Sequence, residues 1–358
     1  MNNNKNAMFG IAATASALAL TMTACSNGDD SGDDGGGGEA GDIRVGLAYD
    51  IGGRGDLSFN DAAYAGLELV ESEMDVEIND VDAAEEETDS DKMNRLELMA
   101  DEGYNPVIAV GFAYADAIAE VAPNYPDVSF AIVDENMEEH EAAETEDLSN
   151  ISSLMFAENE GSFLAGAAAA LSSEADHIGY VGGVQVPMIE SFEAGFVAGA
   201  QEVNPDIEVE SAYVSQPPDF SGFQDPARGG SIADGQIDAG ADVIYHAAGG
   251  SGIGVLDSAA ENEISFIGVD SDQYLTAEDE QQEFVITSMI KRVDTAVFDF
   301  VASVADGTVE GGVTRFNLEN DGVDLADTNE EAYAEFADEI EELRQRVIDG
   351  DIEVPTEP

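Results

Sequence analysis

The sequence predicts an α/β fold of two lobes, each built around a doubly wound parallel sheet. Short apolar runs of the strand type alternate with helical stretches along most of the chain, which is the pattern of sheets covered by helices. Runs such as Val107-Ile108-Ala109-Val110 are continuously apolar, as in parallel strands that are buried on both faces. The chain has 358 residues, which is long for a single core, so we expect two lobes of similar size around a ligand cleft.

Residues 1–24 have the pattern of a signal peptide. Lys5 is the only charged residue before an uncharged stretch that ends in Met22-Thr23-Ala24-Cys25, and this stretch is short for a membrane span. Small residues before a cysteine are typical of the lipobox of lipoproteins, and Cys25 is the only cysteine in the chain. We expect a lipid anchor on Cys25, a flexible acidic linker over residues 25–41, and a location at the extracellular face of the cell membrane.

Acidic residues dominate the composition. The 78 Asp and Glu residues stand against 11 Lys and Arg, which gives a net charge of −67. The hydrophobic share of 44% separates the chain from disordered acidic chains. A folded protein this acidic resembles the proteins of halophiles such as haloarchaea, because in molar salt the Debye length is only about 3 Å and surface repulsion is screened. Such a charge excludes nucleic acid as a partner, because binding to its phosphate backbone requires many Lys and Arg side chains.

The pattern predicts eleven strands and nine helices. The expected strands cover residues 43–49, 76–79, 107–110, 129–133, 151–155, 177–181, 207–213, 242–246, 265–269, 284–289 and 312–317. The expected helices cover residues 61–73, 91–102, 115–122, 161–172, 189–203, 226–239, 252–261, 292–305 and 330–348.

The lobes are expected to share the chain in alternation. Residues 42–157 with about 270–308 would form the first lobe, residues 158–269 with about 309–330 the second, and residues 331–358 a C-terminal helix and tail.

Polar or glycine-rich loops follow several of the expected strands. The first of them, residues 49–60, carries a carboxylate at Asp50, an aromatic ring at Phe59 and an amide at Asn60. Later loops contain Asp134, Gly250 and Asp270. Because the carboxyl ends of parallel strands face one crevice, the loops of two lobes would meet across a cleft.

Other chemistries fit the residues less well. Gly249-Gly250-Ser251-Gly252-Ile253-Gly254 followed by Asp270 resembles a dinucleotide fingerprint, but its third glycine is misplaced. Asp270 is then either an acceptor for a sugar diol or a helix cap. Asp270-Ser271-Asp272 does not continue as a calcium loop, because Tyr274 and Leu275 hold the next ligand positions. No G-x-S-x-G elbow is present and the three histidines lack metal-ligand spacing, so we expect no enzyme, no metal and no cofactor.

An ordered set of motifs identifies a family. The motifs are Gly55-Asp56-Leu57-Ser58-Phe59-Asn60, Tyr125-Pro126-Asp127-Val128-Ser129-Phe130-Ala131-Ile132-Val133-Asp134, Glu160-Gly161-Ser162-Phe163-Leu164-Ala165-Gly166, Gly179-Tyr180-Val181-Gly182-Gly183, Phe192-Glu193-Ala194-Gly195-Phe196, Gly240-Ala241-Asp242-Val243-Ile244, Ile267-Gly268-Val269-Asp270-Ser271-Asp272-Gln273 and Thr287-Ser288-Met289-Ile290-Lys291-Arg292-Val293-Asp294. Together they resemble the basic membrane protein family of bacterial and archaeal lipoproteins, whose known type is a purine nucleoside receptor.

The resemblance implies a type I periplasmic-binding-protein fold that serves an ABC importer, with a permease and an ATPase as partners. It implies a nucleoside held between two aromatic rings, which by position would be Phe59 and Phe192. It also implies that Asp50 and Asp270 accept hydrogen bonds from the base or the ribose. Ser58 and Asn60 would contact the ligand or cap a helix. Arg54 and Gly55 differ from the usual pair of the family, which leaves the choice of ligand open.

Lys291 is one of only three lysines, beside Lys5 and Lys92. In a composition that avoids lysine we interpret Lys291 as a site residue. The alternative is an ion pair with Asp294, which lies three residues further along.

The leading hypothesis is therefore a lipid-anchored receptor whose lobes close on a nucleoside, purine by resemblance, and deliver it to an ABC permease. Two rivals remain at this stage: a receptor for a sugar or another polar metabolite on the same fold, and a surface sensor with no role in import. A nucleoside hydrolase is disfavoured, because the sequence offers no base–nucleophile pair.

We predict that the protein unfolds below molar salt, because the repulsion among its carboxylates is then no longer screened. Far-ultraviolet circular dichroism during dialysis from molar KCl into dilute buffer measures this directly. A spectrum that does not change on dialysis would contradict the prediction.

Overall fold

The computed structural model describes residues 43–74, 76–84 and 87–358. The signal peptide, the linker and Cys25 lie outside these residues, so their assignments stay predictions.

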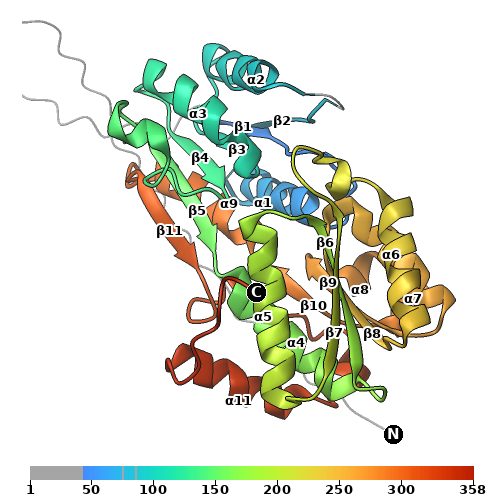
Figure 1. Cartoon of the computed structure of the whole chain (residues 1–358). Coiled ribbons are helices and arrows are strands. Elements are labelled where there is room, and N and C mark those ends of the chain that lie inside the picture. The colour runs from blue at the N-terminus through green and yellow to red at the C-terminus, as the bar shows by residue number, and fades with distance from the viewer. Residues whose placement is uncertain (1–42, 75, 85–86) are drawn as a thin grey trace, which may run out of the picture. The chain divides into compact units, whose positions relative to one another are not determined.

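Twelve strands of the described chain form two six-stranded sheets (Figure 1). The strands are β1 (Arg44–Ala48), β2 (Glu77–Val81), β3 (Val107–Ala109), β4 (Phe130–Val133), β5 (Ile151–Phe156), β6 (His177–Val184), β7 (Glu208–Ser215), β8 (Val243–Ala247), β9 (Ser265–Asp270), β10 (Val285–Lys291), β11 (Gly312–Phe316) and β12 (Val323–Leu325). The first sheet has the order β11-β5-β4-β3-β1-β2 and is parallel throughout. The second has the order β12-β10-β9-β8-β6-β7, in which β12 alone is antiparallel.

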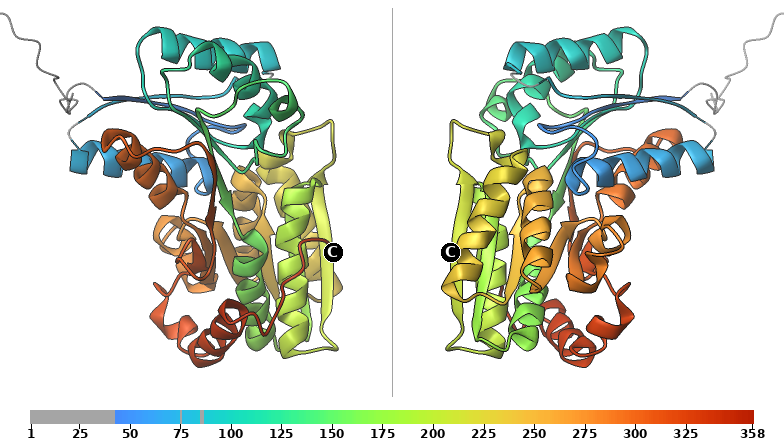
Figure 2. Two further views of the ribbon diagram at one scale, coloured as in Figure 1. Left: turned by 90° about the vertical axis from the view of Figure 1, so that its left-hand side faces the viewer. Right: turned by 90° about the vertical axis from the view of Figure 1, so that its right-hand side faces the viewer.

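Helices cover both faces of each sheet (Figure 2). The helices are α1 (Phe59–Met74), α2 (Asp89–Asp101), α3 (Ala115–Val121), α4 (Glu158–Ser172), α5 (Pro187–Val203), α6 (Pro226–Ala239), α7 (Gly252–Glu261), α8 (Gln273–Thr276), α9 (Val293–Ala305), α10 (Glu330–Tyr333) and α11 (Ala337–Ile348). The first lobe is the first sheet with α2 and α3 on one face and α1 and α9 on the other. The second lobe is the second sheet with α4 and α5 on one face and α6 and α7 on the other. The expected fold class, two doubly wound parallel-sheet lobes, is confirmed.

Side-chain alternation along the strands explains how the core is divided. Along β1 and the residue after it, Val45, Leu47 and Tyr49 point to the face covered by α1, while Ala48 packs on the side of α2 and α3, as the period of two in a strand requires. The apolar side chains of the α1 and α9 layer continue into those of the α4 and α5 layer, so one core runs through both lobes. Separate smaller cores lie under α2 and α3 and under α6 and α7.

Three chain segments cross between the lobes. They join β5 to α4, β10 to α9, and β11 to β12. The first and third crossings touch, because Ala157 N donates to Phe316 O at 2.8 Å and the rings of Phe156 and Phe316 stack at 4.9 Å. The second and third are joined by Arg292 N, which donates to Gly322 O at 3.0 Å. The three crossings are therefore joined to one another, and together they form the hinge along one side of the cleft.

The structure differs from the expected division of the chain at two places. Strand β10 belongs to the second sheet, whereas residues from about 270 were expected in the first lobe. Strand β11 belongs to the first sheet, whereas residues from about 309 were expected in the second. In the structure the chain first passes from one sheet to the other between β5 and α4, at residues 157 and 158. The apolar pattern of a strand indicates that the strand is buried, but it does not indicate which sheet the strand joins. The two later crossings could therefore not be predicted from the sequence.

Three short elements also depart from the sequence expectation. Strand β12 and the single-turn helix α8 were not predicted, because three or four residues give no measurable period. The predicted helix over residues 330–348 is two helices, α10 and α11. Phe336 leaves the helical conformation between them, with φ −126°, and is buried in the core that both lobes share.

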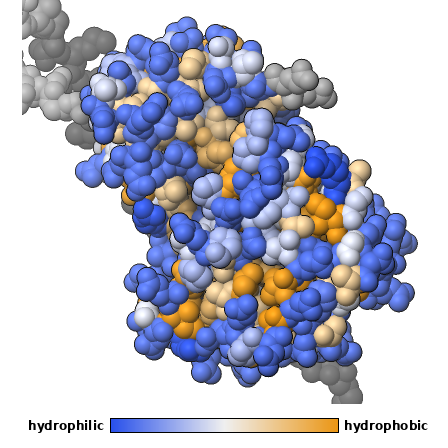
Figure 3. All heavy atoms as spheres, viewed as in Figure 1, coloured by the Kyte–Doolittle hydropathy of each residue, from blue (hydrophilic) through white to orange (hydrophobic). Residues whose placement is uncertain are grey.

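The surface of the described chain is dominated by polar side chains. Figure 3 shows hydrophilic residues over most of the face in view, and the large hydrophobic side chains that are exposed in the described ranges are Leu69, Leu98 and Leu275. Within residues 43–74, 76–84 and 87–358, no helix combines the length and the apolar character needed to cross a membrane.

We predict that the contact between α4 and α5 tolerates no side chain at Gly199. A Cβ there would lie 1.8 Å from the carbonyl oxygen of Phe163, so Gly199→Ala must push the helices apart and should lower the free energy of unfolding by about 1–3 kcal/mol or more. Gly235, inside α6, has open space around it, so Gly235→Ala should raise the free energy by about 0.5–1 kcal/mol. Chemical denaturation in molar KCl measures both, and equal effects would refute the close contact.

Candidate ligand-binding site

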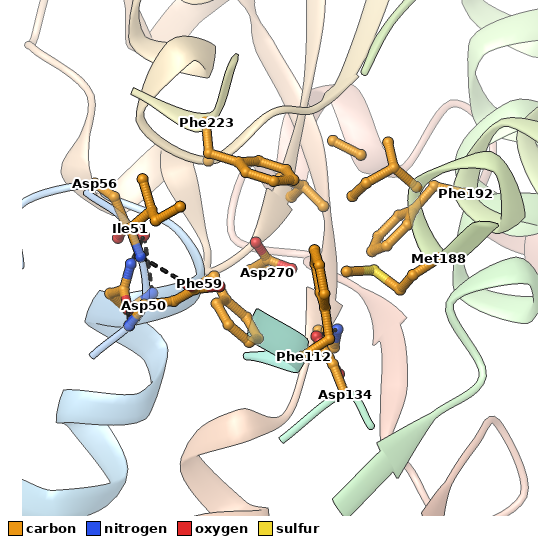
Figure 4. A pocket seen from close by; sticks show the side chains of 16 residues that line it. Asp50, Ile51, Asp56, Phe59, Phe112, Asp134, Met188, Phe192, Phe223 and Asp270 are labelled. Atoms are coloured by element: carbon orange, nitrogen blue, oxygen red, sulfur yellow. Dashed lines mark hydrogen bonds and ion pairs between the residues drawn. The ribbon is translucent and has the colours of Figure 1, made fainter. Parts of the chain in front are cut away.

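A pocket lies between the two lobes at the carboxyl ends of their parallel strands (Figure 4). Its empty volume is about 540 Å³, open solvent at its mouth included, a size suited to a small organic ligand. It is lined by Asp50, Ile51, Asp56, Phe59, Asn60, Phe112, Asp134, Met188, Ile189, Phe192, Phe223, Ala247, Gly249, Val269, Asp270 and Lys291. One part of the wall is apolar and aromatic, and the other carries four carboxylates and one ammonium group.

Two of these carboxylates occupy equivalent places in the two lobes. Asp134 directly follows β4 and Asp270 ends β9, and each strand is fourth along its sheet counted from β2 or β7. The sequence before each is Ser-Phe-x-x-Val-Asp, at 129–134 and 265–270. Both aspartates have left-handed backbones, with φ +67° and +64°, a conformation that costs energy for a residue other than glycine and gathers at functional sites. The fold thus aims one carboxylate into the cleft from each lobe.

The ammonium group of Lys291, at the end of β10, lies among carboxylates and rings. Its Nζ is 2.6 Å from Asp134 Oδ2 of the first lobe and 3.1 Å from Glu158 Oε1 at the first crossing. It also faces the rings of Phe59, Phe156 and Phe192, at 5.0, 5.1 and 5.6 Å from their centroids. Lys291 is 2% exposed.

Charge keeps this lysine protonated. Burial alone would lower its pKa, but Asp134, Glu158 and Asp270 outweigh that effect, so the pKa of Lys291 lies above its ordinary value. Asp294, the alternative partner considered from the sequence, instead binds Arg292 with both carboxylate oxygens, at 2.8 and 3.0 Å. The alternative considered for Lys291, an ion pair with Asp294, is therefore not formed in the structure.

Asp56 organises the loop between β1 and α1. Its Oδ1 accepts from the backbone N–H groups of Ser58 and Asp61, and its Oδ2 from the backbone and side-chain amides of Asn60, all at 2.9–3.1 Å. It satisfies the free donors at the start of α1 as a cap does. Although Asp56 reaches the pocket wall, its acceptor capacity is already committed to the loop.

Asp50 is fixed from three sides. Its backbone N–H donates to Asn60 Oδ1 at 3.1 Å, and its Oδ1 accepts from Ile51 N at 2.8 Å. Gly111, with φ +94°, makes room for it, since a Cβ there would lie 2.2 Å from Asp50 Oδ2. Burial raises the pKa of Asp50 to about 7.

Asp270 stands at the centre of the pocket in Figure 4. Its Oδ2 accepts a hydrogen bond from Ser58 Oγ at 2.5 Å, which leaves Oδ1 for a ligand. Burial raises the pKa of Asp270 to about 6, while Lys291 and Ser58 act in the opposite direction. The carboxylate is therefore ionised and able to accept hydrogen bonds at neutral pH.

Four phenylalanine rings line the pocket, two from each lobe. Phe59 begins α1 and Phe112 begins the 3₁₀ turn Phe112–Tyr114, while Phe192 lies in α5 and Phe223 ends the 3₁₀ turn Ser221–Phe223. Figure 4 shows Phe223 across the pocket from Phe59, with Asp270 between them. Phe59, Phe112 and Phe223 are partly exposed, whereas Phe192 is 3% exposed. The ammonium of Lys291 faces the rings of both Phe59 and Phe192.

Seven of the nine predicted ligand-binding residues line the pocket: Asp50, Phe59, Asn60, Asp134, Phe192, Asp270 and Lys291. Ser58 lies one layer further out, fully buried and bonded to Asp270. Gly250 is not in the wall, and its neighbour Gly249 is. Their roles toward a ligand stay predictions.

Several residues of the site were missed from the sequence. Glu158 and Asp56 are two of 78 acidic residues, and nothing in their spacing marks them as buried. Phe223 and Met188 follow strands of the second lobe as other site residues do, but at a distance from the strand end that the pattern does not fix. Phe112 comes two residues after the expected strand over residues 107–110, and an aromatic ring at that place was the available signal. In the described residues no group of three or more His, Cys, Asp and Glu is arranged to hold a metal ion.

Two lobes joined by three crossings, with a pocket where their strand ends meet, define the periplasmic-binding-protein-like class of folds. A family profile described as ABC transporter substrate-binding protein PnrA-like, the Bmp family, matches residues 43–357. The chain belongs to this family, which consists of substrate-binding proteins and not of enzymes.

Individual proteins agree with the profile. The ABC transporter nucleoside-binding protein BmpA of Lactococcus lactis is 33% identical over 367 residues, which cover 98% of this chain and 99% of that protein. An uncharacterized lipoprotein of Pyrococcus abyssi is 31% identical over 89% of this chain and 78% of its own length. A solved structure of an ABC transporter solute-binding protein from Aeropyrum pernix has a TM-score of 0.75 and 26% identity, and covers 88% of this chain and 93% of its own. The predicted type I periplasmic-binding-protein fold is confirmed.

We predict that Lys291→Met lowers the free energy of unfolding by about 3–5 kcal/mol at pH 8, because two buried carboxylates lose their cation. Without it the pKa values of Asp134 and Glu158 lie further above those of the unfolded chain, and the penalty then grows as pH rises through the folded values. The loss of stability should therefore be smaller at pH 5 than at pH 8.

Arg228→Met is the control. Arg228 pairs with Asp219 at 3.6 Å and both side chains are exposed, so its removal should cost less than about 1 kcal/mol at either pH. Denaturation of both variants in molar KCl measures the difference, and a pH-independent loss in Lys291→Met would contradict the account of the buried pair.

Proposed function

We propose that this substrate-binding protein of an ABC transporter takes a nucleoside, with a purine base favoured, and presents it to the permease and ATPase of an importer. The observation that carries the proposal is the division of the pocket wall into a ring-lined apolar part and a part rich in carboxylate acceptors. A base has two π-faces that stack on rings, and a ribose offers hydroxyl donors to carboxylates. The name of the Lactococcus lactis relative supports the same ligand class.

The charge of the pocket favours a ligand without phosphate. Asp50, Asp56, Asp134 and Asp270 line it, and among the described lining residues Lys291 is the only cation. Its ammonium already contacts Asp134 and Glu158, so a phosphate would meet uncompensated carboxylates. A neutral nucleoside with hydrogen-bond donors avoids this repulsion.

Two arrangements of the base are consistent with the rings. In the first, Phe59 and Phe192 enclose it, as the resemblance implies. In the second, Phe223 is the partner of Phe59, because both rings are partly exposed and lie on opposite sides of the pocket in Figure 4. Stacking contributes about 1–3 kcal/mol per base when a ring is removed to alanine, so the two arrangements can be separated by substitution.

Import would follow from hinge motion of the lobes around the three crossings. A ligand that touches both lobes binds their closed arrangement better than an open one and shifts the equilibrium toward it. A lipid on Cys25 would hold the receptor at the extracellular face of the cell membrane, beside its permease. The Pyrococcus abyssi relative is named a lipoprotein, which supports such an anchor.

Calorimetric titration of the full chain, in detergent and molar KCl, tests the proposal with adenosine, guanosine, inosine, uridine, ribose and adenosine monophosphate. We expect binding of nucleosides, weak or absent binding of ribose, and rejection of the monophosphate. Phe59→Ala should weaken binding by about 1–3 kcal/mol, and whichever of Phe192→Ala and Phe223→Ala has a similar effect identifies the second ring. Tight binding of ribose without binding of any nucleoside would overturn the proposal in favour of a sugar receptor. If the protein is folded and none of the six ligands binds, the proposal is overturned altogether.

We predict that nucleoside affinity falls as pH is lowered through about 6, the pKa to which burial raises Asp270. Above this pH the carboxylate accepts from ribose hydroxyls; below it the group is protonated and an acceptor is lost. Asp270→Asn should cost about 1.5–3 kcal/mol for each hydroxyl bond at pH 7.5 and remove the part of the pH dependence near 6, while any part near 7, where the pKa of Asp50 lies, remains. Asp299→Asn, a substitution outside the pocket lining, should leave both unchanged; equal profiles for wild type and Asp270→Asn would refute the role of Asp270.

A further inference from the structure

The loop between β1 and α1 reaches across the cleft and is bonded to the second lobe at three points. Ser58 Oγ donates to Asp270 Oδ2 at 2.5 Å, Ser271 Oγ donates to Ser58 O at 3.0 Å, and Gln273 Nε2 donates to Leu57 O at 2.9 Å. These bonds join residues more than 200 positions apart in the sequence. An opening of the cleft that draws this loop away from β9 and α8 would break all three.

The third bond depends on which way the amide of Gln273 points. Leu57 O can only accept a hydrogen bond, so Gln273 must present its NH₂ group to it. Its Oε1 then faces His246 Nε2, at 2.9 Å. Because Oε1 can only accept, the proton of His246 must be on Nε2. The chain of donors therefore runs in one direction, from His246 to Gln273 to Leu57.

The fold leaves room for this pair at two glycines. A Cβ at Gly252 would lie 1.9 Å from His246 Cε1, and one at Gly268 would lie 2.6 Å from Gln273 Oε1. His246 is fully buried, stacks on Phe266 at 5.3 Å, and has no partner at Nδ1 in the described part of the chain. Among the described residues, Gln273 is therefore the only hydrogen-bond partner of the buried imidazole.

The receiving carbonyl is presented by an unusual backbone. Leu57 has φ +54°, the left-handed region that a branched side chain rarely adopts. Asp56 holds the turn by accepting from Ser58 N and Asn60 N. Neither Gln273 nor His246 lines the pocket, so neither is placed to touch a ligand there.

We infer that Gln273 is a latch between the lobes, oriented by His246, and that its bond to Leu57 O holds the cleft closed and slows the release of ligand. The release step rests on the proposed function, whereas the latch itself does not. A bond made only in the closed arrangement shifts the opening equilibrium by its own net contribution. For a neutral hydrogen bond this corresponds to about a 2–10-fold change.

The test compares Gln273→Met with wild type in the full chain, in detergent and molar KCl. Hydrogen exchange of the backbone amides of residues 52–61, measured without added ligand, reports opening of the loop. We expect exchange about 2–10 times faster in the variant. The dissociation rate of adenosine, measured by stopped-flow displacement with guanosine, should rise by a similar factor while the association rate stays the same.

Gln236→Met is the matched control. Gln236 is as buried as Gln273, but its amide donates to Tyr180 O and Glu210 O within the second lobe. It should lower the denaturation midpoint without changing exchange in residues 52–61 or the dissociation rate. Gln273→Leu removes both the donor and the acceptor of the side chain, so it should act like Gln273→Met and serves if the latter fails to fold.

A second comparison tests the role of His246 as a positioning residue. His246→Leu frees the amide of Gln273 to turn, so it should accelerate loop exchange, and the double variant with Gln273→Met should be no faster than Gln273→Met alone. Three results would each overturn the latch. They are additive effects of the two substitutions on hydrogen exchange in residues 52–61, exchange at the wild-type rate in Gln273→Met, and exchange that is accelerated equally in Gln236→Met. If no nucleoside binds the wild type, the proposed function fails while the exchange measurements still decide on the latch.

Discussion

The buried ammonium of Lys291 is the constraint on which the arrangement of the lobes depends. It ends β10 of the second sheet, contacts Asp134 of the first, and meets Glu158 where the chain first crosses between them. A charge taken out of water is stable only with partners in good geometry, so its position, that of Asp134 and that of the crossing are fixed together. The same group also shapes the chemistry of the pocket. Its ammonium is paired with Asp134 and Glu158, so the carboxylate of Asp270 keeps an oxygen that can accept a hydrogen bond from a ligand.

Pre-organisation of carboxylates is the second theme of the site. In a chain with 78 acidic residues the presence of an acid means little, and what distinguishes Asp134 and Asp270 is the backbone that holds them. Both stand at the carboxyl ends of equivalent strands, and both occupy left-handed conformations that the surrounding fold must stabilise. The repeat Ser-Phe-x-x-Val-Asp at 129–134 and 265–270 is therefore a trace of the two-lobed fold in the sequence itself.

Much of the fold could be predicted from the sequence, because its strands are short apolar runs and its helices are long enough to show their period. The partition between lobes could not, since β10 and β11 have the same pattern whichever sheet they join. The site was predictable where a residue follows a strand directly, as Asp134 and Asp270 do, or where composition singles it out, as for Lys291. It was not predictable for Glu158, Phe223 or Gln273, whose positions depend on how a crossing, a turn and the opposite lobe come together in space.

The central claim is that the pocket around Asp270 and Lys291 holds a nucleoside with its base between rings and its ribose on carboxylates. The most direct measurement is a crystal structure of the protein grown in molar salt with adenosine. The account predicts density for the base against Phe59 and a ring of the second lobe, a ribose hydroxyl within hydrogen-bond distance of Asp270, and Lys291 still in contact with Asp134. A base turned out to solvent, or a ribose that leaves Asp270 without a contact, would contradict it.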